Sequence, residues 1–186
     1  MEEVVLVDEN DRPVGRAEKI EAHVSAKLHR AFSVFVFDSE GRLLLQKRAA
    51  GKYHSGGLWS NTCCSHPRPG EPTESAAHRR LTEELGFDCE ITKVFDLVYY
   101  AELGNSLYEH EYDHVYVGKF DGSPAPDADE VEDWKWVDVG TLAADLRQNP
   151  HAYSYWLRAS FEELLRRLAS QGLHGFGPVP EVTAGA

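Results

Sequence analysis

The sequence has few cysteines, no long apolar run and a shortage of positive charge. Its three cysteines are an odd number and two of them are adjacent, so we expect no disulfide framework and a reducing compartment. No segment approaches the roughly 20 apolar residues that span a bilayer, and residues 1–7 are too acidic for a signal peptide. These deficits predict a cytoplasmic protein without a membrane partner.

Lysine and arginine total 19 against 31 aspartates and glutamates, which gives a formal net charge of -12. This charge argues against nucleic acid as a partner but not against a phosphorylated small molecule, which needs only a few local cations or metal ions. A length of 186 residues, of which 42% are apolar, suits one domain with a sizeable core. We expect this domain at residues 1–171, a loosely ordered tail at residues 172–186, and a monomer by default.

Hydrophobic patterns place strands early, one helix in the middle, more strands after it and helices at the end. This order is typical of an α+β (mixed α/β) fold. The stretch at residues 51–72 is a long loop rich in Gly, Ser, Pro, His and Cys, and such loops are usually functional. We expect strands at residues 4–7, near 14, 32–37, 43–45, 91–100, 114–120 and 134–137, and helices at 73–85, 141–147 and 153–169.

The central helix carries a recognisable motif. Apolar residues recur every four positions at Ala77, Leu81 and Leu85, and Gly86 suits a helix C-cap. The segment resembles the Nudix box, which implies an α/β/α sandwich with a central mixed sheet and a loop–helix–loop that presents carboxylates to divalent metals. The alternative is that the carboxylates form an ordinary solvated helix face. The matching positions are Glu71, Arg79, Leu81, Glu83, Glu84, Gly86 and Phe87.

Two positions depart from the box. Ser65 stands where the box opens with glycine, and Arg80 stands where its first helical glutamate would be. In Nudix hydrolases that glutamate belongs to the metal cluster that drives water attack on phosphorus. A cation at Arg80 removes a ligand and repels a metal ion, so the scaffold is expected to hold a diphosphate without hydrolysing it.

Two further motifs flank the box. Trp59-Ser60-Asn61-Thr62-Cys63-Cys64-Ser65-His66-Pro67 lies upstream, and Tyr108-Glu109-His110-Glu111 lies downstream. Together with the altered box, they resemble the type I isopentenyl-diphosphate isomerases over about residues 18–156. The resemblance implies an enzyme of isoprenoid biosynthesis that interconverts isopentenyl diphosphate and dimethylallyl diphosphate by protonation and deprotonation through a tertiary carbocation.

The resemblance also implies a metal site of three histidines and two glutamates, which suits Mn²⁺, Zn²⁺ or Mg²⁺. Two carboxylates at positions i and i+2 of a strand share one face, so Glu109 and Glu111 can converge. The two upstream histidines can share an ion only if the chain turns between them. The other histidines that we considered, at positions 54, 110 and 114, match no ligand position. The implied ligands are His23, His29, His66, Glu109 and Glu111.

The remaining roles come from the same resemblance. Cys64 and Glu111 would be the acid–base pair, assisted by Tyr99, and the ring of Trp156 would stabilise the cation. The alternative is that the cysteines are small buried side chains and that Trp156 simply packs, but Cys64 lies two residues before His66, which favours the catalytic role. A second ion, Mg²⁺, would join the diphosphate, Glu84 and the Cys64 carbonyl. The cations that would clamp the diphosphate are Lys19, Arg48, Lys52 and Arg80.

Two other functions compete with this interpretation. A Nudix diphosphohydrolase would use the same fold, and Arg80 and the loop around His66 speak against it. A non-catalytic metal-binding domain would take up metal without turnover, but no catalytic position of the sequence is broken.

Overall fold

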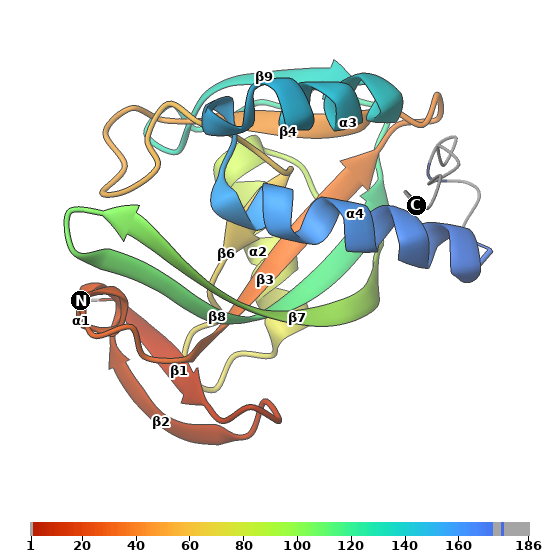
Figure 1. Ribbon diagram of the computed structural model, residues 1–186. Helices are drawn as coiled ribbons and strands as arrows, with labels where there is room; N and C mark the ends of the chain where they lie inside the picture. Colours follow the sequence, from red (N-terminus) through yellow and green to blue (C-terminus); the bar gives the residue numbers. More distant parts are fainter. Residues whose placement is uncertain (1, 173–175, 177–186) are drawn as a thin grey trace, which may run out of the picture.

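The computed structural model describes residues 2–172 and Phe176. Within them, nine strands form one mixed sheet, with helices on both of its faces (Figure 1). The strands are β1 (Glu3–Val7), β2 (Pro13–Glu18), β3 (His29–Phe37), β4 (Leu43–Arg48), β5 (Trp59–Ser60), β6 (Cys63–Ser65), β7 (Ile91–Gly104), β8 (Leu107–Lys119) and β9 (Val131–Val137). The helices are α1 (Lys19–Val24), α2 (Thr73–Leu85), α3 (Val139–Gln148), a 3₁₀ turn at Pro150–Ala152 and α4 (Tyr155–Ser170).

Strand β3 organises the sheet. It pairs parallel with β8 and antiparallel with β6, and it also contacts β1 and β4 through single pairs at its two ends. Its side chains alternate between two apolar layers, as the period of two requires. Phe35 and Phe37 pack beneath α3 and α4, whereas Val34 and Val36 pack beneath α2. The predicted α/β/α sandwich is therefore confirmed.

Helix α2 has the bounds that the sequence predicts, Thr73–Leu85. Ala77, Leu81 and Leu85 face the sheet and are fully buried. Gly86 ends the helix with a φ of 71°, and a Cβ there would lie 2.5 Å from the Ala125 carbonyl oxygen. Glycine is thus required both by the left-handed backbone and by the close approach of a neighbouring segment.

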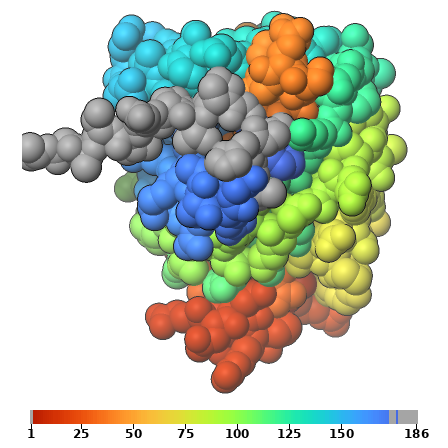
Figure 2. Space-filling model, turned by 90° about the vertical axis from the view of Figure 1, so that its right-hand side faces the viewer, coloured from red at the N-terminus to blue at the C-terminus, as the bar shows by residue number. Residues whose placement is uncertain are grey.

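The N-terminal hairpin of β1 and β2 lies at one end of the molecule, and β9 and α3 lie at the other (Figures 1 and 2). Helix α1 follows this hairpin directly. The carboxylate of Glu18 caps α1 by accepting a hydrogen bond of 2.9 Å from the Glu21 amide. The chain then turns, with Ala26 at a φ of 49°, before β3 begins at His29. This is the turn that the two upstream histidines need in order to meet.

Several elements differ from their predicted extents. Strand β8 begins at Leu107 rather than at residue 114, so both glutamates of the downstream motif lie on it. The stretch predicted as a loop at 51–72 contains β5 and β6, and α1 was not predicted. All three cysteines are free, as expected. The predicted tail at 172–186 lies outside the described residues, apart from Gly172 and Phe176. None of the described helices combines the length and the apolar character that crossing a membrane requires.

Candidate active site

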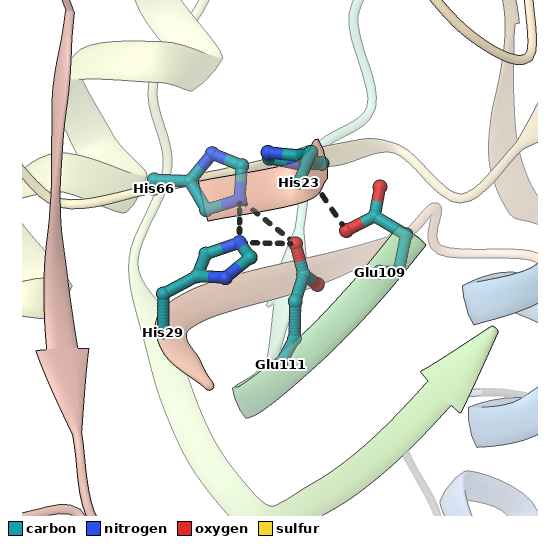
Figure 3. Close-up of side chains that lie close together, drawn as sticks. All are labelled: His23, His29, His66, Glu109 and Glu111. Carbon is teal, nitrogen blue, oxygen red and sulfur yellow. Dashed lines mark hydrogen bonds and ion pairs between the residues drawn. The ribbon is translucent and has the colours of Figure 1, made fainter. Parts of the chain in front are cut away.

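Three histidines from three elements converge at one point (Figure 3). His23 comes from α1, His29 starts β3, and His66 follows β6. Nδ1 of His23 lies 2.7 Å from the Lys19 carbonyl oxygen, and Nδ1 of His29 lies 2.8 Å from that of Lys27. A carbonyl oxygen only accepts, so both Nδ1 atoms carry the proton. Both Nε2 lone pairs are therefore free to face the centre of the cluster.

Two carboxylates complete the cluster from β8. Glu109 and Glu111 share one face of the strand, while His110 between them points the other way and bonds the Ala26 carbonyl. Nε2 of His66 lies 2.8 Å from Oε1 of Glu111, and Nε2 of His29 lies 3.5 Å from the same oxygen. Nε2 of His23 lies 3.4 Å from Oε2 of Glu109.

The chemistry of this group fits a divalent metal ion. All five side chains are buried, and each offers a ligand atom within 4.8 Å of the others. The Nε2 atoms of His29 and His66 face each other at 3.2 Å, and Oε2 of Glu109 is buried without a hydrogen-bond partner. A buried carboxylate oxygen without a partner, next to two imidazole nitrogens that face each other, is costly unless a cation lies between these atoms. The sequence predicted these five residues together, and the fold brings them together.

The pKa values of the two glutamates are shifted in opposite directions. Burial, with the charge of Glu111 beside it, holds the pKa of Glu109 well above its ordinary value. Burial also disfavours the charged form of Glu111, but hydrogen bonds with His29 and His66 outweigh it and hold the pKa of Glu111 well below its ordinary value. Burial lowers the pKa of His66 to about 3 and also lowers that of His23. His23 and His66 are therefore neutral at pH 7, which is the form that binds a metal.

Tyr99 lies opposite Glu111 in the register of β7 and β8. Its hydroxyl donates a short hydrogen bond to Oε2 of Glu111, whose other oxygen faces the histidines. Burial, and then the charge of Glu111, raises the pKa of Tyr99 well above its ordinary value. The tyrosine thus keeps its proton and holds the glutamate from the side away from the imidazoles.

The two adjacent cysteines have different surroundings. Cys63 is fully buried and packs in the apolar layer beneath α2. Cys64 is only partly covered and lines a pocket together with Glu111 and Tyr99. Burial raises the pKa of the Cys64 thiol to about 12, so it is protonated at neutral pH. The fold therefore places Cys64 and not Cys63 where a substrate could reach it.

Trp156, in the first turn of α4, lines the same pocket. Its Nε1 donates a hydrogen bond of 2.8 Å to Oγ of Ser60, and the guanidinium carbon of Arg48 lies 5.1 Å from the centre of its ring. Ser60 Oγ is also 3.8 Å from the Cys64 sulfur. Trp156 is thus both a packed side chain and a wall of the pocket.

The four cations predicted to bind the diphosphate all line this pocket: Lys19, Arg48, Lys52 and Arg80. Three of them are paired with glutamates. Lys19 Nζ lies 3.2 Å from Glu2, Lys52 bonds Glu130, and Arg80 Nη2 lies 2.7 Å from Glu84 and 3.1 Å from Glu130. Glu84 also accepts a hydrogen bond of 2.9 Å from Gln46. Carboxylates therefore neutralise most of the cations at the place where a diphosphate would do so.

The sequence interpretation missed two residues that line this pocket, Tyr53 and His54. His54 matches no ligand position, yet its side chain is only 6% exposed and its Nε2 lies 3.2 Å from Oε1 of Glu109. Its ring also stacks on that of His23, with the centroids 5.6 Å apart. Only its place in the polar loop at 51–72, which precedes the motif of His66, could have drawn attention to it. His110 and His114, the other two histidines that we considered, bond a turn carbonyl and Asp11 outside the group.

Comparisons with known proteins agree with this geometry. The NUDIX domain model matches residues 27–159. The chain is 55% identical to isopentenyl-diphosphate Delta-isomerase 2 of Aromatoleum aromaticum, over 95% of this chain and 92% of that protein. It is 56% identical to the isopentenyl-diphosphate Delta-isomerase of Burkholderia multivorans, over 87% of this chain and 92% of that protein.

Solved structures agree on the fold alone. DR0079 from Deinococcus radiodurans superimposes with a TM-score of 0.72 at 19% identity, over 87% of this chain and 98% of that chain. A MutT protein from Methanosarcina mazei gives a TM-score of 0.62 at 18% identity, over 75% of this chain and 94% of that chain. With the matched domain, the relatives and the assembled pocket taken together, the chain belongs to the isopentenyl-diphosphate Delta-isomerase family of the Nudix fold.

Proposed function

We propose that this enzyme interconverts isopentenyl diphosphate and dimethylallyl diphosphate by adding a proton to the terminal alkene carbon and removing one from the carbon on the other side of the cation. The observation that carries this proposal is that one pocket is lined by Cys64, by the Tyr99–Glu111 pair and by the four cations. The chemistry needs an acid, a base and shelter from water, and it also needs an anchor for the diphosphate. The acid, the base and the anchor for the diphosphate all line one cavity.

Cys64 and Glu111 are the proposed acid–base pair, one on each side of the reacting carbons. Glu111 is charged and can accept a proton, while Cys64 is a neutral thiol and can donate one. Tyr99 would pass protons to or from Glu111 through the hydrogen bond at Oε2. The Trp156 ring would face the tertiary cation, a contact worth about 2 kcal/mol when it is desolvated.

The diphosphate would replace Glu2 and Glu130 as the partner of the cations. Lys19, Lys52 and Arg80 are already held around the pocket by these carboxylates, so binding exchanges one set of anions for another. Arg48, which stacks on Trp156, would lie between the diphosphate and the cation-stabilising ring. Glu84 and the Cys64 carbonyl would help to hold the Mg²⁺ that accompanies the diphosphate.

The group of His23, His29, His66, Glu109 and Glu111 would hold one divalent ion, Mn²⁺, Zn²⁺ or Mg²⁺. When bound, such an ion supplies positive charge that keeps Glu111 in one place and tunes its acidity. The residues themselves keep the two carboxylates on one strand face, and backbone carbonyls keep the rings of His23 and His29 in one tautomer.

We propose that residues 1–171 form one domain that acts in the cytoplasm as a monomer. The net charge of -12 supports a small-molecule partner rather than nucleic acid or an anionic membrane surface. The three free cysteines support a reducing compartment.

Reaction in D₂O tests the proposed chemistry. Because the added proton comes from the enzyme and ultimately from solvent, the new methyl group of dimethylallyl diphosphate should carry deuterium by NMR. Prolonged incubation should also label recovered isopentenyl diphosphate, because both steps are reversible. Product without deuterium at carbon would contradict the acid–base route, and phosphate release with unlabelled carbon would indicate a hydrolase instead.

A further inference from the structure

His54 occupies a position beside the metal group that none of the assigned roles explains. It lies on the loop between β4 and β5, and its side chain is 6% exposed. Nε2 of His54 is 3.2 Å from Oε1 of Glu109, while Oε2 of the same carboxylate lies 3.4 Å from Nε2 of His23. Glu109 is therefore held between a histidine on the loop and a histidine of the metal group.

The contacts of His54 give each of its ring nitrogens a partner. Nδ1 lies 3.2 Å from Oγ of Ser55, a hydroxyl that can donate to it. Nε2 can then carry the proton of the neutral ring and direct it at Oε1 of Glu109, at a distance that suits an N–H···O hydrogen bond. Both ring nitrogens thus have a partner, and neither is left free to bind a metal ion. The five residues that can share an ion do not include His54.

The surrounding rings hold His54 in place. Its ring stacks on His23 at 5.6 Å and meets the edges of Trp156 at 5.9 Å and Tyr53 at 4.3 Å. His54 therefore touches the metal group on one side and the wall of the substrate pocket on the other.

The backbone of the loop is equally fixed. Arg48 donates a hydrogen bond of 3.3 Å to the His54 carbonyl, and its own carbonyl accepts one of 2.9 Å from the Gly57 amide. Ser55 has a φ of 51°, a left-handed conformation that is uncommon for a residue other than glycine. A Cβ on Gly56 would lie 2.6 Å from the Ala50 carbonyl oxygen, so the loop needs glycine there to close. This amount of local constraint is what the accurate placement of one side chain requires.

We propose that His54 is a positioning residue that holds Oε1 of Glu109 by a hydrogen bond and thereby directs Oε2 at the metal ion. The inference rests on the metal site proposed above. The observation that points to it is the unpartnered state of Oε2, which is buried and faces the histidines. A carboxylate held at one oxygen presents the other in a single direction, which is how outer hydrogen bonds raise metal affinity in proteins. Without His54, the Glu109 carboxylate can turn away from the site.

Metal titration of the full chain tests this role directly. Protein stripped of metal with a chelator is titrated with Mn²⁺ in the absence of substrate, and free Mn²⁺ is measured by its EPR signal. Omitting the diphosphate keeps the second proposed ion, which needs it, out of the measurement. We expect His54→Ala to weaken Mn²⁺ binding about 10- to 100-fold, the usual effect of removing an outer hydrogen-bond partner.

Two further variants make the result specific. His54→Gln keeps an N–H donor on a side chain of similar reach, so it should restore most of the lost affinity, whereas His54→Leu should not. His151→Ala removes an exposed histidine far from the group in sequence and should bind Mn²⁺ like the wild type. Circular dichroism of the metal-free proteins checks that each variant is folded.

The outcomes distinguish a failure of the role of His54 from a failure of the proposed metal site. If the wild type binds no Mn²⁺, the metal site and the role of His54 both fail. If the wild type binds Mn²⁺ and folded His54→Ala binds it equally well, only the role of His54 fails. If His54→Gln is as weak as His54→Leu, the hydrogen bond is not what matters, and the inference is again overturned.

Discussion

The indole nitrogen of Trp156 donates a hydrogen bond of 2.8 Å to the hydroxyl oxygen of Ser60, although 96 residues separate the two. Ser60 Oγ also accepts a hydrogen bond of 3.1 Å from Ser154, the residue that precedes α4. One hydroxyl thus ties the first turn of α4 to β5 and sets the direction of the Trp156 ring at the pocket wall.

This relationship predicts the effect of Ser60→Ala. The change leaves the buried indole N–H without a partner, which should lower the free energy of unfolding by about 1–3 kcal/mol in urea titrations. Because the ring loses its fixed position, kcat should fall about 10- to 100-fold with little change in KM. Ser170→Ala, at the exposed end of α4, is the control and should change neither. An unchanged kcat would mean that the direction of the ring is set elsewhere.

The two cysteines should differ sharply on substitution. Cys64→Ala removes a protonated thiol from the pocket wall, so turnover should fall by about 10²- to 10⁴-fold. Cys63→Ala changes a fully buried side chain of the apolar layer, so it should lower stability by about 1 kcal/mol and keep substantial activity. Isotopic isomerisation assays with thermal unfolding of both variants check this, and the opposite ranking would transfer the acid–base role to Cys63.

Local patterns predicted most elements of the fold. The helix at 73–85 carries regular apolar spacing and a C-cap glycine, and its bounds are met at both ends. The six-residue α1 is too short to show a period, so its existence depends on the Glu18 cap and on packing of Ala22. The first half of β8 alternates buried Glu109, Glu111 and Asp113, which a hydrophobic pattern cannot register as an inward face.

The site was predictable where it depends on motifs, and not where it depends on the closure of a loop. Glu109 and Glu111 could be placed together because two residues of a strand share a face. His54 could not, since its contact with Glu109 joins two segments 55 residues apart through a loop whose conformation depends on Ser55 and Gly56. The same holds for the pairing of Lys52 and Arg80 by Glu130, which no local pattern connects.

Removal of the metal should abolish turnover. Glu109→Gln and His66→Ala each delete a ligand of the buried group, so both should lower the metal content found by elemental analysis of the purified protein. His78→Ala changes a histidine on α2 that bonds Asp88 and serves as the control. Activity should return when Mn²⁺ or Mg²⁺ is added back to chelator-treated wild type. Full turnover by protein shown to be free of metal would end the proposal of a metal-dependent reaction.

The Glu71 carboxylate should stabilise the protein only at pH values above the range in which it becomes protonated. Hydrogen bonds from the Arg79 guanidinium, at 2.7 and 2.8 Å, and from the Arg68 amide hold the pKa of Glu71 below its ordinary value. A lowered pKa in the folded state gives stability that is present above the unfolded pKa, near 4.5, and lost as the pH falls through the folded value. Glu71→Gln should therefore cost about 1 kcal/mol at pH 7 and less at pH 3.

Urea unfolding at the two pH values measures this difference. The exposed Glu102→Gln on β7 is the matched control and should show no such dependence on pH. A Glu71→Gln penalty of equal size at pH 3 and pH 7 would show that shape, and not the carboxylate charge, anchors the loop to α2.

Arg80 distinguishes an isomerase from a hydrolase built on the same fold. Its guanidinium is shared by Glu83, Glu84 and Glu130, and despite its burial these carboxylates keep its pKa above the ordinary value, so it is charged at every working pH. Arg80→Gln should lower kcat/KM about 10- to 100-fold through loss of a charged hydrogen bond to the diphosphate. Arg80→Lys keeps the charge but loses the planar fork, so its kcat/KM should lie between those of the wild type and Arg80→Gln.

A phosphate-release assay tests the hydrolase alternative. Neither Arg80→Gln nor Arg80→Lys should release phosphate from isopentenyl diphosphate in a colorimetric assay, because removing the arginine does not supply the missing carboxylate. Arg80→Glu supplies it, and with Glu83 and Glu84 would place three carboxylates on one helix face. If Arg80→Glu releases phosphate while Arg80→Gln does not, the arginine also keeps a hydrolytic metal cluster from forming. If Arg80→Glu and Arg80→Gln both isomerise the substrate with the wild-type kcat/KM, Arg80 does not clamp the diphosphate, and Lys19, Arg48 and Lys52 suffice to bind it.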